Sequence, residues 1–243
     1  MEYFIYFLIT LILSVLFSMA GAGAGVAVIP VLHMMGVEFN LAKTVGLFGG
    51  FVTTFTSTLL NLKRKVLDIK FALPLAVTLP IFSPIGAQLS KYINESLVKA
   101  LFAVFLIFSA SMMMFFKKKS KARFQKWWIL AVLGIFVGTA AGLLGVGGGN
   151  MLLPLLVLLG FEPKKVAVAV SFVVPFSTIA SFLSYASFVK IDYPLLFSVA
   201  LGALIGAYIG NHMLHVKLSQ EQIKKIIALI LYALAIKLFI SLL

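Results

Sequence analysis

The sequence contains no cysteine, and only 11% of its 243 residues are charged. The absence of cysteine excludes disulfide bonds, thiol catalysis and metal sites with cysteine ligands. Acidic residues are scarce as well, with seven Asp and Glu against 20 Lys and Arg. All seven lie near the ends of apolar segments, so none is placed like a buried proton carrier. His212 and His215 lack a third ligand for a metal, and we expect no metal and no other cofactor.

Apolar residues are abundant, at 62% of the chain. A soluble domain of this size could not bury so much apolar surface, so we expect an all-α polytopic protein with lipid around it. Segments of about the 20 residues that cross a bilayer occur at 3–20, 42–62, 70–89, 96–116, 127–144, 166–189, 191–214 and 222–242. Two further apolar segments, 26–35 and 150–159, reach only halfway across and predict half-helices.

A glycine-rich motif precedes each short segment. It reads GAGAGVAVIPVLHMMGVE from Gly21 and GVGGGNMLLPLLVLLGFE from Gly145, an offset of 124 residues. At the same offset the chain continues to match at Thr53/Ser177, Thr54/Thr178, Ser57/Ser181, Asp68/Asp192 and Gly86/Gly210. We therefore predict a first repeat over 1–116, a basic linker over 117–126 and a second repeat over 127–243. The matched acidic residues, including Glu38 and Glu162, are expected to position loops.

Loop charges predict how the repeats are oriented. We expect each repeat to be a broken hairpin, a helix plus a half-helix, followed by three transmembrane helices. One membrane side then collects 15 of the 20 Lys and Arg, and the other side collects Lys43, Lys91, Lys99, Lys190 and Lys237. Because Lys and Arg favour the cytoplasmic side, this predicts inverted repeats in the cell (inner) membrane, with both termini outside and the 117–126 loop cytoplasmic. The net charge of +13 then reflects topology and contact with membrane lipids, and we expect no nucleic acid partner.

Glycine breaks inside apolar helices predict a substrate site in the middle of the membrane. Glycine lets the backbone approach a ligand, and the half-helix after it presents unpaired N–H groups and the positive end of its dipole to an anion. Asn150 begins the second half-helix, where its amide can donate to an oxyanion or cap the helix, and Val26 is its counterpart. The alternative is that the glycines only allow close helix packing. The expected site residues are Gly23, Gly25, Val26, Gly147, Gly148, Gly149 and Asn150. No Lys or Arg falls at the centre of a predicted span, so amides and helix dipoles would hold the anion.

A matched set of hydroxyl residues follows the two motifs: Thr53, Thr54 and Ser57, with Ser177, Thr178 and Ser181. Positions four apart share one face of a helix. These side chains either coordinate substrate beside the glycine loops or bond their own backbone.

Five further residues are candidates for hinge or gate positions: Gly21, Pro30, Gly145, Pro154 and His33. Proline inside a helix produces a kink that can serve as a hinge. His33 has no histidine counterpart in the second copy, and it either titrates as a gate or packs as an interfacial histidine.

At its two glycine motifs the chain resembles the TauE/SafE family of sulfite exporters, and the resemblance covers nearly the whole chain. The shared pattern is the glycine run, the proline five residues after it and the next glycine: Gly21, Gly23, Gly25, Pro30 and Gly36, then Gly145, Gly147, Gly148, Gly149, Pro154 and Gly160. The first copy departs from the pattern, with Ala22 and Ala24 between its glycines. The resemblance implies export of sulfite, sulfonates or related sulfur-containing organic anions.

We therefore expect a secondary transporter that exports small oxyanions by alternating access of two inverted repeats, and not an enzyme. The alternatives are an anion channel or a transporter of another small anion, such as a carboxylate or sulfate, including an importer. An intramembrane serine protease would need a nucleophile and base on facing helices, and no G-x-S-x-G motif supports one. A structural scaffold would leave the repeated glycine breaks without a purpose. The sequence leaves open which anion is carried, whether protons are coupled and whether the chain forms a homo-oligomer.

Overall fold

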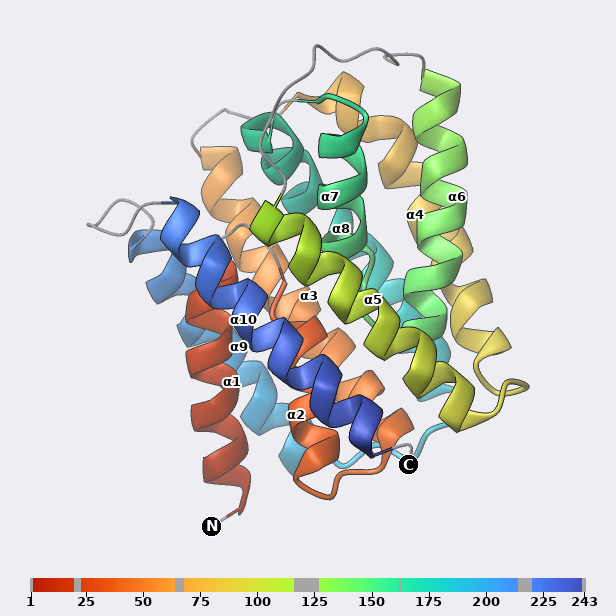
Figure 1. Cartoon of the computed structure of the whole chain (residues 1–243), viewed down its shortest axis with the longest axis vertical. Helices are drawn as coiled ribbons and strands as arrows, with labels where there is room; N and C mark the ends of the chain where they lie inside the picture. Colours follow the sequence, from red (N-terminus) through yellow and green to blue (C-terminus); the bar gives the residue numbers. More distant parts are fainter. Residues whose placement is uncertain are drawn as a thin grey trace.

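The computed structural model describes residues 2–19, 23–63, 68–115, 127–161, 163–213 and 220–241. These residues form helices and no strand, which confirms the all-α class (Figure 1). The helices are α1 (Glu2–Met19), α2 (Gly25–Met34), α3 (Phe39–Lys63), α4 (Ile69–Leu89), α5 (Glu95–Phe115), α6 (Trp127–Leu144), α7 (Gly149–Leu158), α8 (Pro163–Ala186), α9 (Tyr193–Met213) and α10 (Gln220–Ile240).

Within the described ranges, seven helices are long and apolar enough to cross a membrane. The two half-helices are present as predicted, since α2 and α7 each contain 10 residues and start within one residue of the expected positions. Helix α10 was predicted as an eighth span. Its 21 residues are long enough to cross a membrane, but it carries Lys224, Lys225 and Lys237 and is more charged than the seven candidate spans.

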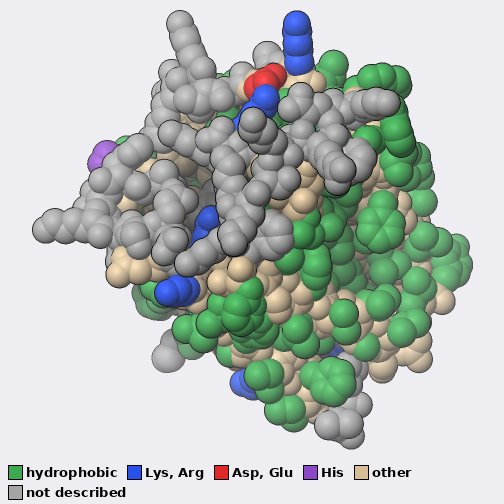
Figure 2. Space-filling model, turned by 45° about the horizontal axis from the view of Figure 1, so that its top comes forward, with side chains coloured by type: hydrophobic (Ala, Val, Ile, Leu, Met, Phe, Trp, Pro, Cys, Tyr) green, Lys and Arg blue, Asp and Glu red, His purple; other side chains and the backbone are tan. Residues whose placement is uncertain are grey.

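The flank of the helical bundle is apolar. On α4 the exposed side chains Leu73, Val77, Ile81 and Ile85 recur every fourth residue, and each is about half exposed. Figure 2 shows a broad expanse of hydrophobic side chains over the flank of the molecule. A soluble protein rarely exposes such a continuous apolar surface, so this face is suited to contact lipid.

The helices of the two predicted repeats pack in matched pairs. Helix α1 packs along α9, and its counterpart α6 packs along α4. Likewise α3 contacts α9 and α8 contacts α4, while α3 and α8 pack on each other. The first helix of each repeat therefore lies against the fourth helix of the other, and the two halves interlock.

Glycine allows the closest of these contacts. Gly86 of α4 faces the backbone of Thr139 in α6, and Gly210 of α9 faces the backbone of Val15 in α1. A Cβ added at Gly86 would lie 1.9 Å from the Thr139 carbonyl oxygen, and one at Gly210 would lie 2.3 Å from the Val15 oxygen. These two contacts correspond at the 124-residue offset, so the duplicated glycine has the same packing role in both halves.

Gly86→Ala is expected to destabilise the protein by about 1–3 kcal/mol, because the clash is with a helix backbone that must move away as a whole. The matched control is Gly50→Ala, since a Cβ there meets its nearest atom at an ordinary 3.7 Å and alanine favours the helix. Thermal unfolding in detergent should give a lower melting temperature for Gly86→Ala and an equal or higher one for Gly50→Ala. Equal melting temperatures for the two variants would contradict this packing.

Acidic residues cap three of the helices. The Asp68 carboxylate accepts a hydrogen bond from the Phe71 N–H at 3.2 Å at the start of α4, and Asp192 does the same for Leu195 at the start of α9. Glu38 accepts from two N–H groups at the start of α3. The Lys165 ammonium, 2.7 Å from Asp68, holds the pKa of Asp68 below its usual range. The expected loop-positioning role therefore fits these residues, while Glu162 lies outside the described residues.

Candidate functional site

The two glycine breaks meet inside the bundle. The Asn150 side-chain amide, at the start of α7, donates a hydrogen bond to the Gly23 carbonyl at 3.2 Å. Gly25 and Val26, at the start of α2, are buried. Both half-helices therefore begin at one interior point, although their motifs are separated by 124 residues in the sequence.

The second break is a left-handed glycine loop. Gly145, Gly147 and Gly148 have φ values of 76°, 73° and 76°, a conformation that residues with a Cβ rarely adopt. Space is restricted there as well, because a Cβ on Gly147 would lie 2.0 Å from Cγ2 of Thr178. The sequence G-V-G-G-G at this position is therefore required by backbone conformation and by the close approach of α8.

The first break has a different conformation. Ala24, the residue before α2, has φ −69°, which alanine adopts freely, and this explains how the first copy accommodates alanine between its glycines. Gly25 is needed for space, because a Cβ there would lie 2.6 Å from the Gly46 carbonyl oxygen of α3. The predicted hinge Gly21 lies outside the described residues.

Both half-helices start without a capping side chain. Ala24 precedes α2 and Gly148 precedes α7, and neither position supplies a side-chain hydrogen bond to the first turn. Backbone N–H groups and the positive end of a helix dipole attract anions at such a terminus. At their other ends, Gly36 and Gly160 adopt φ values of 95° and 90° and terminate the half-helices in matched turns. Each half-helix therefore begins with an uncapped N-terminus of the kind that attracts anions.

The hydroxyl set mostly bonds backbone. Thr53, Thr54, Ser57 and Thr178 each donate to the carbonyl four residues earlier in their own helix. The Ser177 hydroxyl lies 3.1 Å from the Val174 carbonyl of its own helix and also donates to the Gly147 carbonyl at 2.9 Å, which links α8 to the second glycine loop. The Ser181 hydroxyl is buried and has no hydrogen-bond partner among the described residues. Of the six hydroxyls, the one of Ser177 therefore bonds the second glycine loop directly.

The remaining gate candidates lie along the half-helices. Pro30 and Pro154 each lie inside their half-helix, at matched positions. His33 has Nδ1 at 3.0 Å from the Val37 carbonyl oxygen, and its ring packs edge-on against Phe39 at 5.2 Å. These contacts fit the packing interpretation of His33.

Sequence reasoning counted Lys43 among the charges of the outer side and did not predict that its side chain is buried. It lies in α3, one turn after the helix begins, and only 1% of its surface is exposed. Its ammonium donates to Ser90 Oγ at 2.7 Å and lies 5.0 Å and 4.9 Å from the ring centres of Phe39 and Tyr185. The sequence feature that could have placed Lys43 inside α3 is Glu38. It caps the helix, which therefore begins at Phe39, before the apolar segment predicted from residue 42.

Lys43 also contacts the second glycine break. Its aliphatic stem packs against Gly145, where a Cβ would lie 2.8 Å from Cβ and Cγ of the lysine. Tyr185, which packs beside the ammonium, donates hydrogen bonds from its hydroxyl to the carbonyls of Gly142 and Leu143. A buried lysine therefore lies next to the loop that begins α7.

Comparison with known proteins agrees with this architecture. The family model described as "Sulfite exporter TauE/SafE" matches residues 6–238. The chain is 28% identical over 237 residues to "Probable membrane transporter protein MJ0441" of Methanocaldococcus jannaschii, covering 86% of this chain and 88% of that protein. It is also 28% identical over 243 residues to "Probable membrane transporter protein YunE" of Bacillus subtilis, with the same coverage. "Sulfite exporter TauE/SafE family protein 3" of Arabidopsis thaliana is 31% identical over 114 residues, which is 44% of this chain and 22% of that protein. No solved structure matches the chain.

Proposed function

Because the chain belongs to the sulfite exporter TauE/SafE family, we propose that it is a secondary transporter that exports small oxyanions such as sulfite or sulfonates. The family is one of membrane transporters and not of enzymes, and the apolar helices agree with a multi-pass membrane protein. The observation that carries the proposal is the contact between Asn150 and Gly23, which brings two uncapped helix N-termini together inside the bundle. Such termini attract anions without a metal or a fixed arginine.

We further propose that the repeats are inverted and that they rock about this point. The start of α1 and the end of α10 lie at the same end of the bundle in Figure 1, and successive helices run in alternating directions. Because each half contains five helices, this alternation would make every helix of the second half run opposite to its counterpart in the first half. The matched contacts of α1 with α9 and of α6 with α4 support a two-fold relation between the halves.

The inverted arrangement predicts opposite accessibility for two exposed lysines, Lys70 at the start of α4 and Lys190 before α9. Because the chain has no cysteine, Lys70→Cys and Lys190→Cys give single reactive thiols in an otherwise unchanged protein. In intact cells, a membrane-impermeant maleimide is expected to label position 190 and to label position 70 only after the membrane is opened. Lysed cells in which both react serve as the control. Labelling of both positions from the same side would overturn the inverted repeats and the external termini.

The membrane potential is the proposed driving force for export. An inside-negative potential supplies about 2.3 kcal/mol per elementary charge per 100 mV, so outward movement of an anion needs no coupled ion. A site that holds the anion through amides and helix dipoles also releases it more readily than a fixed ion pair would.

Flux in proteoliposomes tests the proposed function, using sulfite, a small sulfonate, sulfate and a small carboxylate as substrates. We expect saturable flux of a sulfur oxyanion that increases with a potential driving the anion out of the vesicle. Counterflow separates a transporter from an anion channel, because only a carrier exchanges labelled for unlabelled substrate against a gradient. Absence of flux for all four anions, or flux that follows pH and ignores voltage, would refute the proposal as stated.

A further inference from the structure

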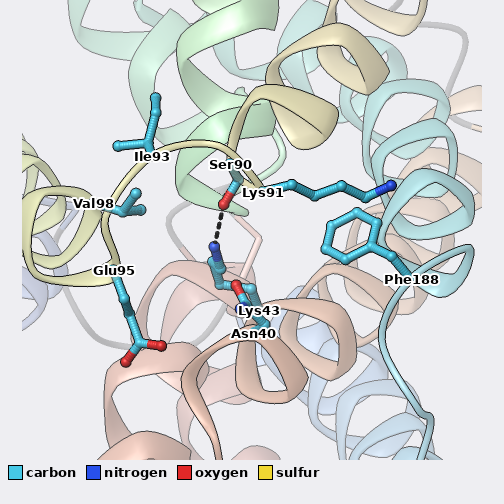
Figure 3. Close-up of a pocket in the computed structure, with 8 residues that line it drawn as sticks. All are labelled: Asn40, Lys43, Ser90, Lys91, Ile93, Glu95, Val98 and Phe188. Carbon is cyan, nitrogen blue, oxygen red and sulfur yellow. Dashed lines mark hydrogen bonds between the residues drawn. The ribbon is translucent and has the colours of Figure 1, made fainter.

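A polar cavity of about 240 Å³ lies at the end of the bundle that holds both chain termini. Asn40, Lys43, Ser90, Lys91, Glu95 and Phe188 are among the residues that line it (Figure 3). They come from α3, from the α4–α5 turn, from the start of α5 and from the segment after α8, so both predicted repeats contribute to the lining. At roughly 30 Å³ per water molecule, it has room for a small oxyanion together with some of its hydration.

Lys43 forms no ion pair with a carboxylate in the described part of the chain. The ion pairs in the described part of the chain are Lys99 with Glu95 and Lys165 with Asp68, and Lys43 takes part in neither. The two nearest candidate carboxylates are engaged elsewhere, Glu95 with Lys99 and Glu38 with the N–H groups that start α3. A buried ammonium whose polar partner is one neutral hydroxyl is costly to keep, unless a negative ligand joins it.

Lys43 faces the cavity and the glycine break at the same time. Figure 3 shows Lys43 and Ser90 pointing toward each other across the cavity, while Lys91 extends over the ring of Phe188. The stem of Lys43 packs on Gly145, the first glycine of the loop that leads into α7. An anion held by the ammonium would therefore lie close to the loop that leads into α7.

We propose that this cavity is a second anion site, in which Lys43 binds a small oxyanion with help from Ser90, Asn40 and the second cation, Lys91. The site rests on the proposed function for its substrate class, and the loop charges place it at the outer end of the transporter. It receives the anion that leaves the two helix N-termini and gives it a cationic partner before release. The aromatic rings of Phe39 and Tyr185 hold the ammonium in place when no anion is bound.

Thermal unfolding of the purified protein with and without sulfite, and in parallel with sulfate, tests the site. Ligand that binds only the folded state raises the melting temperature, so wild type is expected to show an anion-dependent increase. Lys43→Met keeps the length of the side chain and removes its charge. It is expected to lose that increase while melting no lower than wild type without anion, because an uncompensated buried charge has been removed. Lys165→Met, at the opposite end of the bundle, is the matched control and should keep the increase.

Lys91→Met provides a second variant at an exposed position. It should weaken anion binding without changing the melting temperature in the absence of anion. The half-saturating sulfite concentration should therefore rise with Lys91→Met, whereas Lys43→Met leaves no anion-dependent increase to titrate. No anion-dependent increase in wild type, or the same increase in Lys43→Met, would overturn the site. A Lys43-dependent increase in melting temperature without any flux in proteoliposomes would instead refute the proposed function, while the proposed anion site would still be supported.

Discussion

Gly147→Ala is expected to abolish anion flux in proteoliposomes. At φ 73°, the left-handed conformation costs a residue with a Cβ roughly 1–2 kcal/mol. The new methyl group would also lie 2.0 Å from Cγ2 of Thr178, so the loop must move away from α8. That movement breaks the bond from Ser177 to the Gly147 carbonyl and shifts the N-terminus of α7, which is the half of the proposed site that carries Asn150.

Two further variants separate the local effect from a general loss of folding. Gly36→Ala introduces the same backbone strain at φ 95°, but nothing lies within 4 Å of its Cβ and the position is outside the site. It should lower stability slightly and leave flux intact. Gly147→Ala combined with Thr178→Ser removes the clashing methyl group and should regain stability together with part of the flux, because the loop no longer has to move away from α8. Flux at the wild-type rate in Gly147→Ala would show that the loop conformation is unimportant for transport.

Asn150→Asp is expected to reduce transport by at least about tenfold at limiting substrate. The change keeps the shape of the side chain but removes the donor that reaches the Gly23 carbonyl at 3.2 Å. It also places a carboxylate at the N-terminus of α7, where the proposed substrate would carry the same charge. Hydrogen bonds to charged groups contribute about 1.5–3 kcal/mol, which corresponds to roughly a 10- to 150-fold change in affinity.

Asn61→Asp is the matched control, because Asn61 donates a similar amide hydrogen bond to Ser171 Oγ away from the glycine breaks. Initial flux rates over a range of substrate concentrations, compared at equal protein in the vesicles, measure both variants. We expect Asn150→Asp to raise the half-saturating concentration and Asn61→Asp to change it little. Equal effects of the two variants would mean that Asn150 has no special role in binding.

The half-helices could be predicted from the sequence, and Lys43 could not. Glycine runs stop a helix locally, and 10 apolar residues are too few to cross a bilayer, so α2 and α7 follow from short stretches of sequence. The position of Lys43 depends instead on contacts between segments far apart in the chain, with Ser90 and Tyr185. Counting loop charges treats every lysine near a span end as exposed to water, and that assumption fails where three segments close over one side chain.

The hydroxyl set shows a second limit. Spacing alone places Thr53 and Ser57 on one face, and a hydroxyl on that face can bond either a ligand or the carbonyl four residues earlier. The structure has the backbone bond for both residues. The sequence also gave no sign that Asn150 would reach the first break, because that contact depends on how the two repeats assemble.

Substrate protection of a thiol at the first glycine break tests the central claim most directly. Val26→Cys places the only cysteine of the chain at the start of α2, beside the contact between Gly23 and Asn150. In proteoliposomes that carry out flux, a small charged thiol reagent should react with this cysteine during turnover, and the transported anion should slow the reaction in proportion to its occupancy. A thiol that never reacts during turnover, or that reacts at the same rate with and without saturating anion, would contradict an anion site between the two half-helices.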